Sequence, residues 1–141
     1  MLESIRQEIK ERNQYLGKKK VSSIYFGGGT PSILKASEIK YLIRNIYKSH
    51  IIRERVELTI ECNPEDLTEI KLKEYKNMGI NRLSIGVQSF NDTDLKFMNR
   101  SHNAQQAISS VHLAKNMGFK NITIDLIYGL PNQKLKNWER N

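Results

Sequence analysis

The sequence of 141 residues contains a single cysteine, Cys62, and this scarcity excludes an internal disulfide. Unpaired thiols are typical of reducing compartments, so the cysteine count favours the cytoplasm. Long hydrophobic runs are also missing, since the apolar stretch Ile122–Leu130 is too short to cross a bilayer. The first residues, 1–20, are amphipathic and lack the layout of a signal peptide. The sequence therefore predicts a cytoplasmic protein without a membrane span.

Signatures of nucleic-acid binding are scarce as well. The net charge is +8, but no zinc finger or RNA-reading aromatic motif accompanies it. Lysine and arginine are spread along the chain, and the densest run, Lys18–Lys20, directly precedes a predicted strand. We interpret this run as a solvated loop rather than a phosphate-binding patch. No nucleic-acid partner is predicted.

What is present is the composition of a globular chain, with 38% hydrophobic and 27% charged residues and a length that suits one domain. Helical and strand patterns alternate along it. Helices are predicted over residues 2–17, from Ser37 to about Ile46, over Thr68–Met78, from Asn91, from Asn103 to Gly118, and around Leu135–Trp138. Strands are predicted over Val21–Phe26, Arg55–Glu61, Asn81–Gln88 and Asn121–Tyr128.

Local signals mark several helix ends. Ser37 is expected to cap the second helix, and Asn103 with Gln106 resembles a capping box. The helix after this box is expected to bury an apolar face that consists of Ala107, Ile108, Val111 and Ala114. Strands separated by helical crossovers imply an α/β fold with a parallel sheet and right-handed connections.

Polar residues stand at the end of every predicted strand. The strands run into Gly27–Thr30, Glu61–Asn63, Gln88–Ser89 and Asp125, respectively. In parallel α/β folds this edge of the sheet is where ligands bind. A purely structural domain needs no carboxylate or amide at each strand end, so the pattern indicates a site.

The glycine run Gly27–Gly29 lets a backbone approach a ligand closely, although a plain tight turn explains it equally well when it is taken alone. It is not the dinucleotide fingerprint, because Ser32 stands where the third spaced glycine belongs. It is not a Walker loop either, because no Gly-Lys-Ser/Thr follows.

The other candidates differ in how strongly they suggest function. Glu61 faces away from Cys62, which we expect to be a small packed residue rather than a nucleophile. Arg100 lies between two helices and could pair with a carboxylate, but a surface arginine is the simpler interpretation of it alone. Asp125 lies within an apolar strand, where a carboxylate needs a partner. His50, His102 and His112 have no metal-ligand spacing and are interpreted as structural.

Several segments together resemble one family, the radical S-adenosylmethionine (SAM) proteins that comprise oxygen-independent coproporphyrinogen III oxidases and HemW-type haem chaperones. The resemblance covers about Val21 to Trp138. Ser89-Phe90 and Arg100-Ser101-His102 are more similar to the chaperone branch. The segments that carry the resemblance are Ile24–Ser32, Glu61–Glu65, Gly79–Phe90 and Asp125–Pro131.

The resemblance implies a partial parallel (β/α) barrel of the radical-SAM type, truncated at both ends, with residues 1–141 forming about four β/α units of one incomplete core domain. It also implies a set of SAM contacts: Gly28, Gly29, Thr30, Glu61, Gln88, Arg100 and Asp125. Haem or a porphyrin is the implied small-molecule partner, and a haem-acceptor protein is the further partner expected of a chaperone.

Family members also hold a 4Fe-4S cluster through three cysteines in a CxxxCxxC arrangement. Cys62 alone cannot replace them, because cluster ligation needs several thiolates. We therefore expect a fragment whose full-length parent binds the cluster, and we predict neither catalytic nor metal-binding residues within it. A stand-alone module that binds SAM or haem without redox chemistry is the alternative. An aldolase-like barrel ranks last, because no predicted strand contains a lysine for a Schiff base.

Overall fold

The computed structural model describes residues 1–131 and 133–141. Its elements follow the order predicted from the sequence, with two short 3-10 helices, η1 and η2, added after the first two strands. The elements are α1 (Leu2–Glu11), β1 (Val21–Phe26), η1 (Pro31–Ile33), α2 (Ala36–Ser49), β2 (Ile52–Cys62), η2 (Pro64–Asp66), α3 (Glu69–Asn77), β3 (Arg82–Gln88), α4 (Asp92–Phe97), α5 (Ala104–Asn116), β4 (Asn121–Leu126) and α6 (Leu135–Trp138).

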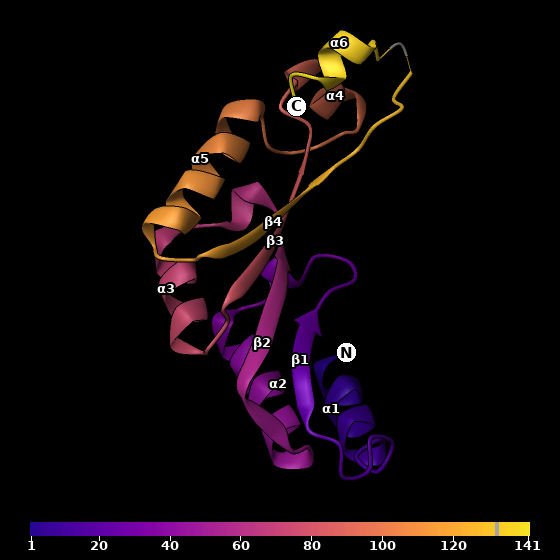
Figure 1. The fold of residues 1–141 in the computed structure, drawn as a ribbon, viewed down its shortest axis with the longest axis vertical. Helices are drawn as coiled ribbons and strands as arrows, with labels where there is room; N and C mark the ends of the chain where they lie inside the picture. Colours follow the sequence, from indigo (N-terminus) through magenta and orange to yellow (C-terminus); the bar gives the residue numbers. More distant parts are fainter. Residues whose placement is uncertain (132) are drawn as a thin grey trace.

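The strands form one four-stranded sheet in the order β1-β2-β3-β4, and every neighbouring pair is parallel. This arrangement confirms the predicted α/β class. Helices α3 and α5 lie along one side of the sheet, while α4 and α6 gather at the end toward which the strands point (Figure 1). Because all strands run the same way, their carboxyl ends meet at one edge, and the loops that follow them start there.

The two faces of the sheet differ in chemistry because side chains alternate along each strand. On β2 and β3, alternate residues pack under the helices: Leu58, Ile60, Cys62, Leu83, Ile85 and Val87. The residues between them face the opposite side and are mostly polar, including Glu57, Glu61, Ser84 and Gln88. The apolar face therefore holds the sheet to its helices, and the polar face is available for a site.

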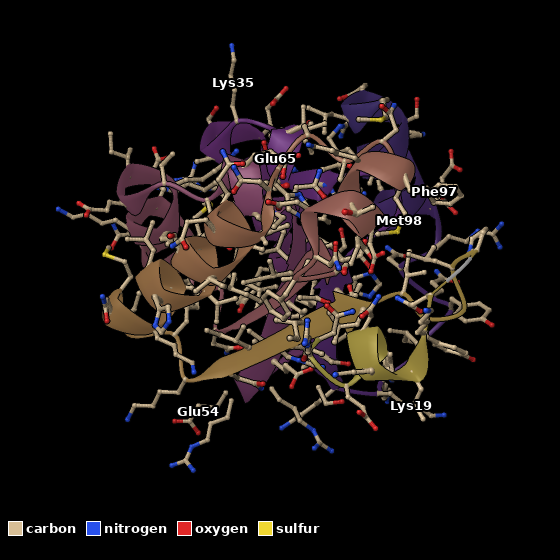
Figure 2. All side chains as sticks on the ribbon, turned by 90° about the horizontal axis from the view of Figure 1, so that it is seen from above. Lys19, Lys35, Glu54, Glu65, Phe97 and Met98 are labelled. Atoms are coloured by element: carbon tan, nitrogen blue, oxygen red, sulfur yellow. The ribbon has the colours of Figure 1, made fainter. Side chains whose placement is uncertain are left out.

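Three local predictions are wrong. The first helix ends at Glu11 rather than Gly17, because the residues from Lys10 to Gln14 are polar and Tyr15 is exposed, so no buried side chain supports another turn. Ser37 does not cap α2; instead Glu38 accepts a hydrogen bond of 2.8 Å from the Lys35 backbone N–H. The side chain of Lys35 itself points away from the molecule (Figure 2).

The third wrong prediction concerns Ile108, which is 39% exposed, because it lies on the flank of α5 that faces away from the sheet. The capping box that opens this helix is confirmed: Asn103 and Gln106 exchange two hydrogen bonds of 2.8 Å. Across the described residues, no helix is long and apolar enough to span a membrane.

The bounds of three strands also differ from the prediction, although β3 changes only by starting at Arg82 instead of Asn81. Strand β2 is longer than predicted at both ends, whereas β4 stops at Leu126 instead of Tyr128. The shorter end of β4 coincides with an irregularity in its pairing with β3 between Ile85 and Gln88. The backbone of Gln88 has a positive φ of 67°, which interrupts the regular ladder at this point.

The buried centre of β3 predicts the result of a matched pair of isoleucine substitutions. Ile85 is fully buried, whereas Ile70 on α3 is 74% exposed. We expect Ile85→Ala to lower the free energy of unfolding by about 2–5 kcal/mol, because it leaves a cavity, and Ile70→Ala to change it by less than about 0.5 kcal/mol. Urea titrations monitored by circular dichroism measure both values. Equal effects of the two substitutions would contradict the assignment of the core.

Burial of Cys62 predicts low thiol reactivity. Desolvation raises the pKa of the Cys62 thiol to about 12, so it carries no thiolate near neutral pH. We expect iodoacetamide to label the native chain at pH 8 at least about 100-fold more slowly than the urea-unfolded chain, as mass spectrometry would measure. The folded thiol keeps its proton above the pH at which the unfolded thiol loses it. The contribution of Cys62 to the free energy of unfolding therefore decreases as pH rises toward 12. Rapid labelling of the native chain would place Cys62 outside the core.

Candidate functional site

A polar cavity of about 140 Å³ opens at the carboxyl edge of the sheet. It contains most of the residues that the sequence singled out, and strands β2, β3 and β4 and the loop after β1 contribute to it. Its walls are formed by Gly29, Thr30, Glu61, Cys62, Asn63, Ser84, Gly86, Gln88, Arg100 and Asp125. Of the predicted SAM contacts, only Gly28 lies outside the lining. The predicted convergence of Thr30, Glu61, Gln88 and Asp125 on a common cavity is therefore present.

Glu61 organises the glycine loop on one side of this cavity. The Gly28 backbone N–H donates to Glu61 Oε2 over 3.0 Å, and the Tyr25 hydroxyl donates to Glu61 Oε1 over 2.8 Å. The bond to Glu61, together with desolvation, raises the pKa of Tyr25, so the phenol stays a neutral donor. The Gly28 N–H is thus engaged by Glu61. Gly29, with a positive φ of 65° and open space where a Cβ would be, lines the cavity.

Ser32 fixes the far end of the same loop. Its buried hydroxyl donates to Asp66 Oδ2 over 2.5 Å and accepts a bond of 3.2 Å from the Asn63 backbone N–H. Lys71 donates from its ammonium group to the Ser32 carbonyl oxygen. These contacts tie the loop after β1 to the loop after β2, so the two loops form one wall with a fixed shape.

The end of β3 supplies the floor of the cavity. At Gly86, an added Cβ would lie 2.9 Å from Gln88 Nε2 and 3.7 Å from Asn63 Oδ1, so glycine leaves this space open. Gln88 follows with its positive φ of 67°, a conformation that costs a residue other than glycine about 1–3 kcal/mol.

Arg100 reaches the cavity from the loop between α4 and α5. Its Nη2 donates to Asn63 Oδ1 over 3.0 Å and to the Gly86 carbonyl over 3.3 Å. Its Nε–H is buried and has no hydrogen-bond partner. A buried donor without a partner is costly, and a bound acceptor would remove that cost. The alternative interpretation of Arg100 as a plain surface residue is therefore wrong.

Asp125 lines the cavity from an exposed position and not from the apolar surroundings that its sequence context suggests. The strand around it, β4, is at the edge of the sheet, and Asp125 is exposed rather than enclosed by apolar neighbours. Its one hydrogen bond comes from Ser84 Oγ over 3.3 Å. The predicted enclosure of Asp125 within an apolar strand is wrong, because β4 is paired on one side only. Asp125 nevertheless lines the cavity.

Three contributors were missed in the sequence: Tyr25, Asn63 and Ser84. Asn63 and Ser84 do carry a signal, since Asn63 directly follows β2 and Ser84 is two residues from Gly86 on the same face of β3. Tyr25 carries none, because alternation places it on the open face with nothing to mark it as a partner of Glu61. Long-range pairing of this kind depends on the parallel register of β1 with β2.

The arrangement suits a ligand that carries both signs of charge. Glu61 and Asp125 offer carboxylate oxygens, while Arg100 offers an unpaired N–H. The volume is below the roughly 300–1,000 Å³ of most ligand pockets, which favours one polar end of a ligand rather than a whole molecule. A 4Fe-4S cluster does not fit, since Cys62 is the chain's one cysteine and no group of three metal-ligating side chains occurs among the described residues.

Comparison with known proteins identifies relatives over nearly the entire chain. The family model described as the Radical SAM superfamily matches residues 3–140. The heme chaperone HemW of Haemophilus influenzae is 40% identical over 136 residues, which cover 96% of this chain and 36% of that protein. HemW of Bacillus subtilis is 37% identical over 141 residues and is covered to 37%. The chain thus spans about a third of the length of the curated relatives that it matches.

Solved structures of radical SAM proteins share the fold of this chain. Coproporphyrinogen III oxidase (HemN) from Escherichia coli, a radical SAM enzyme, superimposes with a TM-score of 0.88 at 32% identity. The match covers 99% of this chain and 32% of that one. Elp3 from Methanocaldococcus infernus shares the fold at 21% identity and a TM-score of 0.73. With the family match and the HemW relatives, these likenesses show that the chain belongs to the radical SAM superfamily.

Proposed function

We propose that the chain is the part of a HemW-like radical SAM protein that binds S-adenosylmethionine, and that its polar cavity holds the amino-acid end of that cofactor. One observation carries the proposal: Arg100, whose buried Nε–H has no partner, lines a cavity that two carboxylates also line. An α-amino acid group is a zwitterion, so it satisfies a guanidinium and a carboxylate at the same time. Residues 1–141 then form one incomplete core domain with a β/α unit for each of its strands.

Each predicted contact has a distinct chemical task in this proposal. Arg100 donates to the cofactor carboxylate, and Gly29 and Thr30 close the loop around it. Glu61 and Asp125 accept bonds from amino and hydroxyl groups, while the Gln88 amide can serve as donor or acceptor. Gly28 contributes indirectly, because its N–H fixes the Glu61 carboxylate at 3.0 Å.

In this proposal, the chain supplies the binding of SAM but not its reductive cleavage. In radical SAM proteins an iron–sulfur cluster supplies the electron that starts radical chemistry. The residues of this chain can bind and orient SAM and exclude water from its polar end, but they cannot hold the cluster. We therefore propose that the 141 residues alone bind SAM without cleaving it.

The parent's role lies in haem metabolism under this proposal, with haem or a porphyrin as its second ligand and a haem-acceptor protein as its partner. The names of the HemW relatives, up to 42% identical, support haem transfer. Oxidation of coproporphyrinogen is the second candidate, because the HemN structure is similar over 99% of the chain. Haem binding by the parent, without turnover of coproporphyrinogen, would decide for the chaperone.

The proposal predicts that the chain binds SAM through Glu61. We expect Glu61→Gln to weaken binding at least about tenfold, because it removes a charged acceptor and loosens the Gly28 loop. Glu54→Gln is the matched control on the same strand, because Glu54 is exposed and projects outward at the rim of the molecule (Figure 2). Isothermal calorimetry with SAM and with the non-cleavable S-adenosylhomocysteine measures all three chains.

The same titrations test the alternatives. A wild-type chain that binds haem but neither SAM nor its analogue would favour a haem-binding module. SAM binding that Glu61→Gln leaves unchanged would remove the proposed cavity as its site. Cleavage of SAM by this chain under anaerobic, reducing conditions would contradict the separation of binding from chemistry.

Gly86 gives a second test, in which binding changes and folding does not. Gly86→Ala would direct a methyl group into the cavity, and Gln88 Nε2, at 2.9 Å, is the mobile end of a side chain that can move aside. We expect SAM affinity to fall about tenfold while the free energy of unfolding changes by less than about 1 kcal/mol. Calorimetry and urea titration give the two values. Unchanged affinity in a folded variant would argue that the ligand does not reach the floor of the cavity.

A further inference from the structure

His102 is the one buried histidine of the described residues, and both of its ring nitrogens have partners. Nδ1 lies 3.1 Å from Glu65 Oε2, and Nε2 lies 2.9 Å from the Val87 carbonyl oxygen. The side chain of His102 has no exposed surface, and that of Glu65 is 26% exposed. The ring therefore bridges η2 and the end of β3 directly behind the cavity.

Both partners of the ring are oxygen atoms that accept hydrogen bonds. Desolvation acts to raise the pKa of the Glu65 carboxyl, but hydrogen bonds from Ser101 and His102 outweigh it and hold that pKa below its usual value. The contacts on opposite sides of the ring therefore hold it in one orientation between η2 and β3.

The Val87 carbonyl is also the anchor of a strained turn. It accepts a second hydrogen bond, of 2.9 Å, from the Ser89 backbone N–H, which closes a three-residue turn around Gln88. A turn of this size with a positive φ at its centre is rare and strained, and φ of Gln88 is 67°. Such strain persists where surrounding contacts hold it, and His102 supplies one of them.

The same histidine holds the loop that carries Arg100. Ser101 donates to Glu65 Oε1, so neighbouring residues of this loop bind both oxygens of one carboxylate. The loop begins at Asn99, which also has a positive φ, of 53°. Glu65 is the charged group placed on the ring, since the contact from β3 is an uncharged carbonyl and the Arg100 guanidinium is directed to Asn63 and Gly86.

We propose that His102 is a positioning residue that, held between Glu65 and the Val87 carbonyl, fixes Gln88 and Arg100 at the cavity. The identity of the ligand rests on the proposed function, but the geometry does not. His102 is too far inside to touch a ligand, because no surface of its side chain is exposed. It acts through the two residues that it holds. Its effect on binding must therefore pass through Arg100 or Gln88.

Positioning is tested by solvent exchange of the buried Arg100 Nε–H. We expect His102→Gln, and Glu65→Gln as a milder variant, to accelerate this exchange at least about tenfold, because the loop loses a charge-assisted anchor. His112→Gln is the matched control and should leave the rate unchanged. If His102→Gln does not fold, Glu65→Gln decides. Exchange that stays slow in the folded variants would overturn the proposal even if SAM never binds.

The link to the ligand is tested by a double-mutant cycle on SAM affinity. We expect His102→Gln to weaken binding about tenfold in the wild-type chain and less than about twofold in the Arg100→Ala, Gln88→Ala background. Equal losses in both backgrounds would show that His102 acts independently and would overturn its positioning role. A chain that binds no SAM contradicts the proposed function alone, since the exchange rates still decide for or against positioning.

Discussion

Side chains alternate strictly between the two faces of each parallel strand. This constraint links the packing of the core on one face to the position of the cavity residues on the other. Leu58, Ile60 and Cys62 pack under helices, so Glu57, Thr59 and Glu61 between them must face the other side. A shift of one residue in β2 would bury Glu61 and expose Ile60, which makes the register costly to change. The apolar face thereby fixes the direction of every polar side chain at the carboxyl edge.

Because the register is fixed, interactions at the edge cooperate across loops. Glu61 holds the glycine loop after β1, and Ser32 ties the end of that loop to Asn63. Asn63 in turn accepts from Arg100, which belongs to a loop more than thirty residues further along the chain. The cavity is thus closed by a chain of hydrogen bonds in which each loop is held by the next. These hydrogen bonds fix the shape of the cavity, and a site of fixed shape lowers the cost of binding a ligand.

Much of this organisation could be read from the sequence, because it depends on local patterns. The alternating strands, the Asn103–Gln106 capping box and the polar strand ends all follow from residue order. The conformation of Gln88 and the pairing of Tyr25 with Glu61 could not be predicted from residue order, because they depend on how β1, β2 and β3 are aligned in space. Asp125 was misjudged for the same reason, since only the sheet order reveals that β4 is an edge.

The position of the strain is informative about function. Gln88 and Asn99 are the two non-glycine residues with positive φ in the described chain, and both lie beside the buried His102. A strained backbone is maintained only where surrounding contacts overdetermine it, and here a carboxylate, an imidazole and a carbonyl meet at one point. A domain selected for stability alone would gain by placing glycine at both positions. Retaining side chains there makes sense when the Gln88 amide and the adjacent Arg100 guanidinium must face a ligand in a fixed orientation.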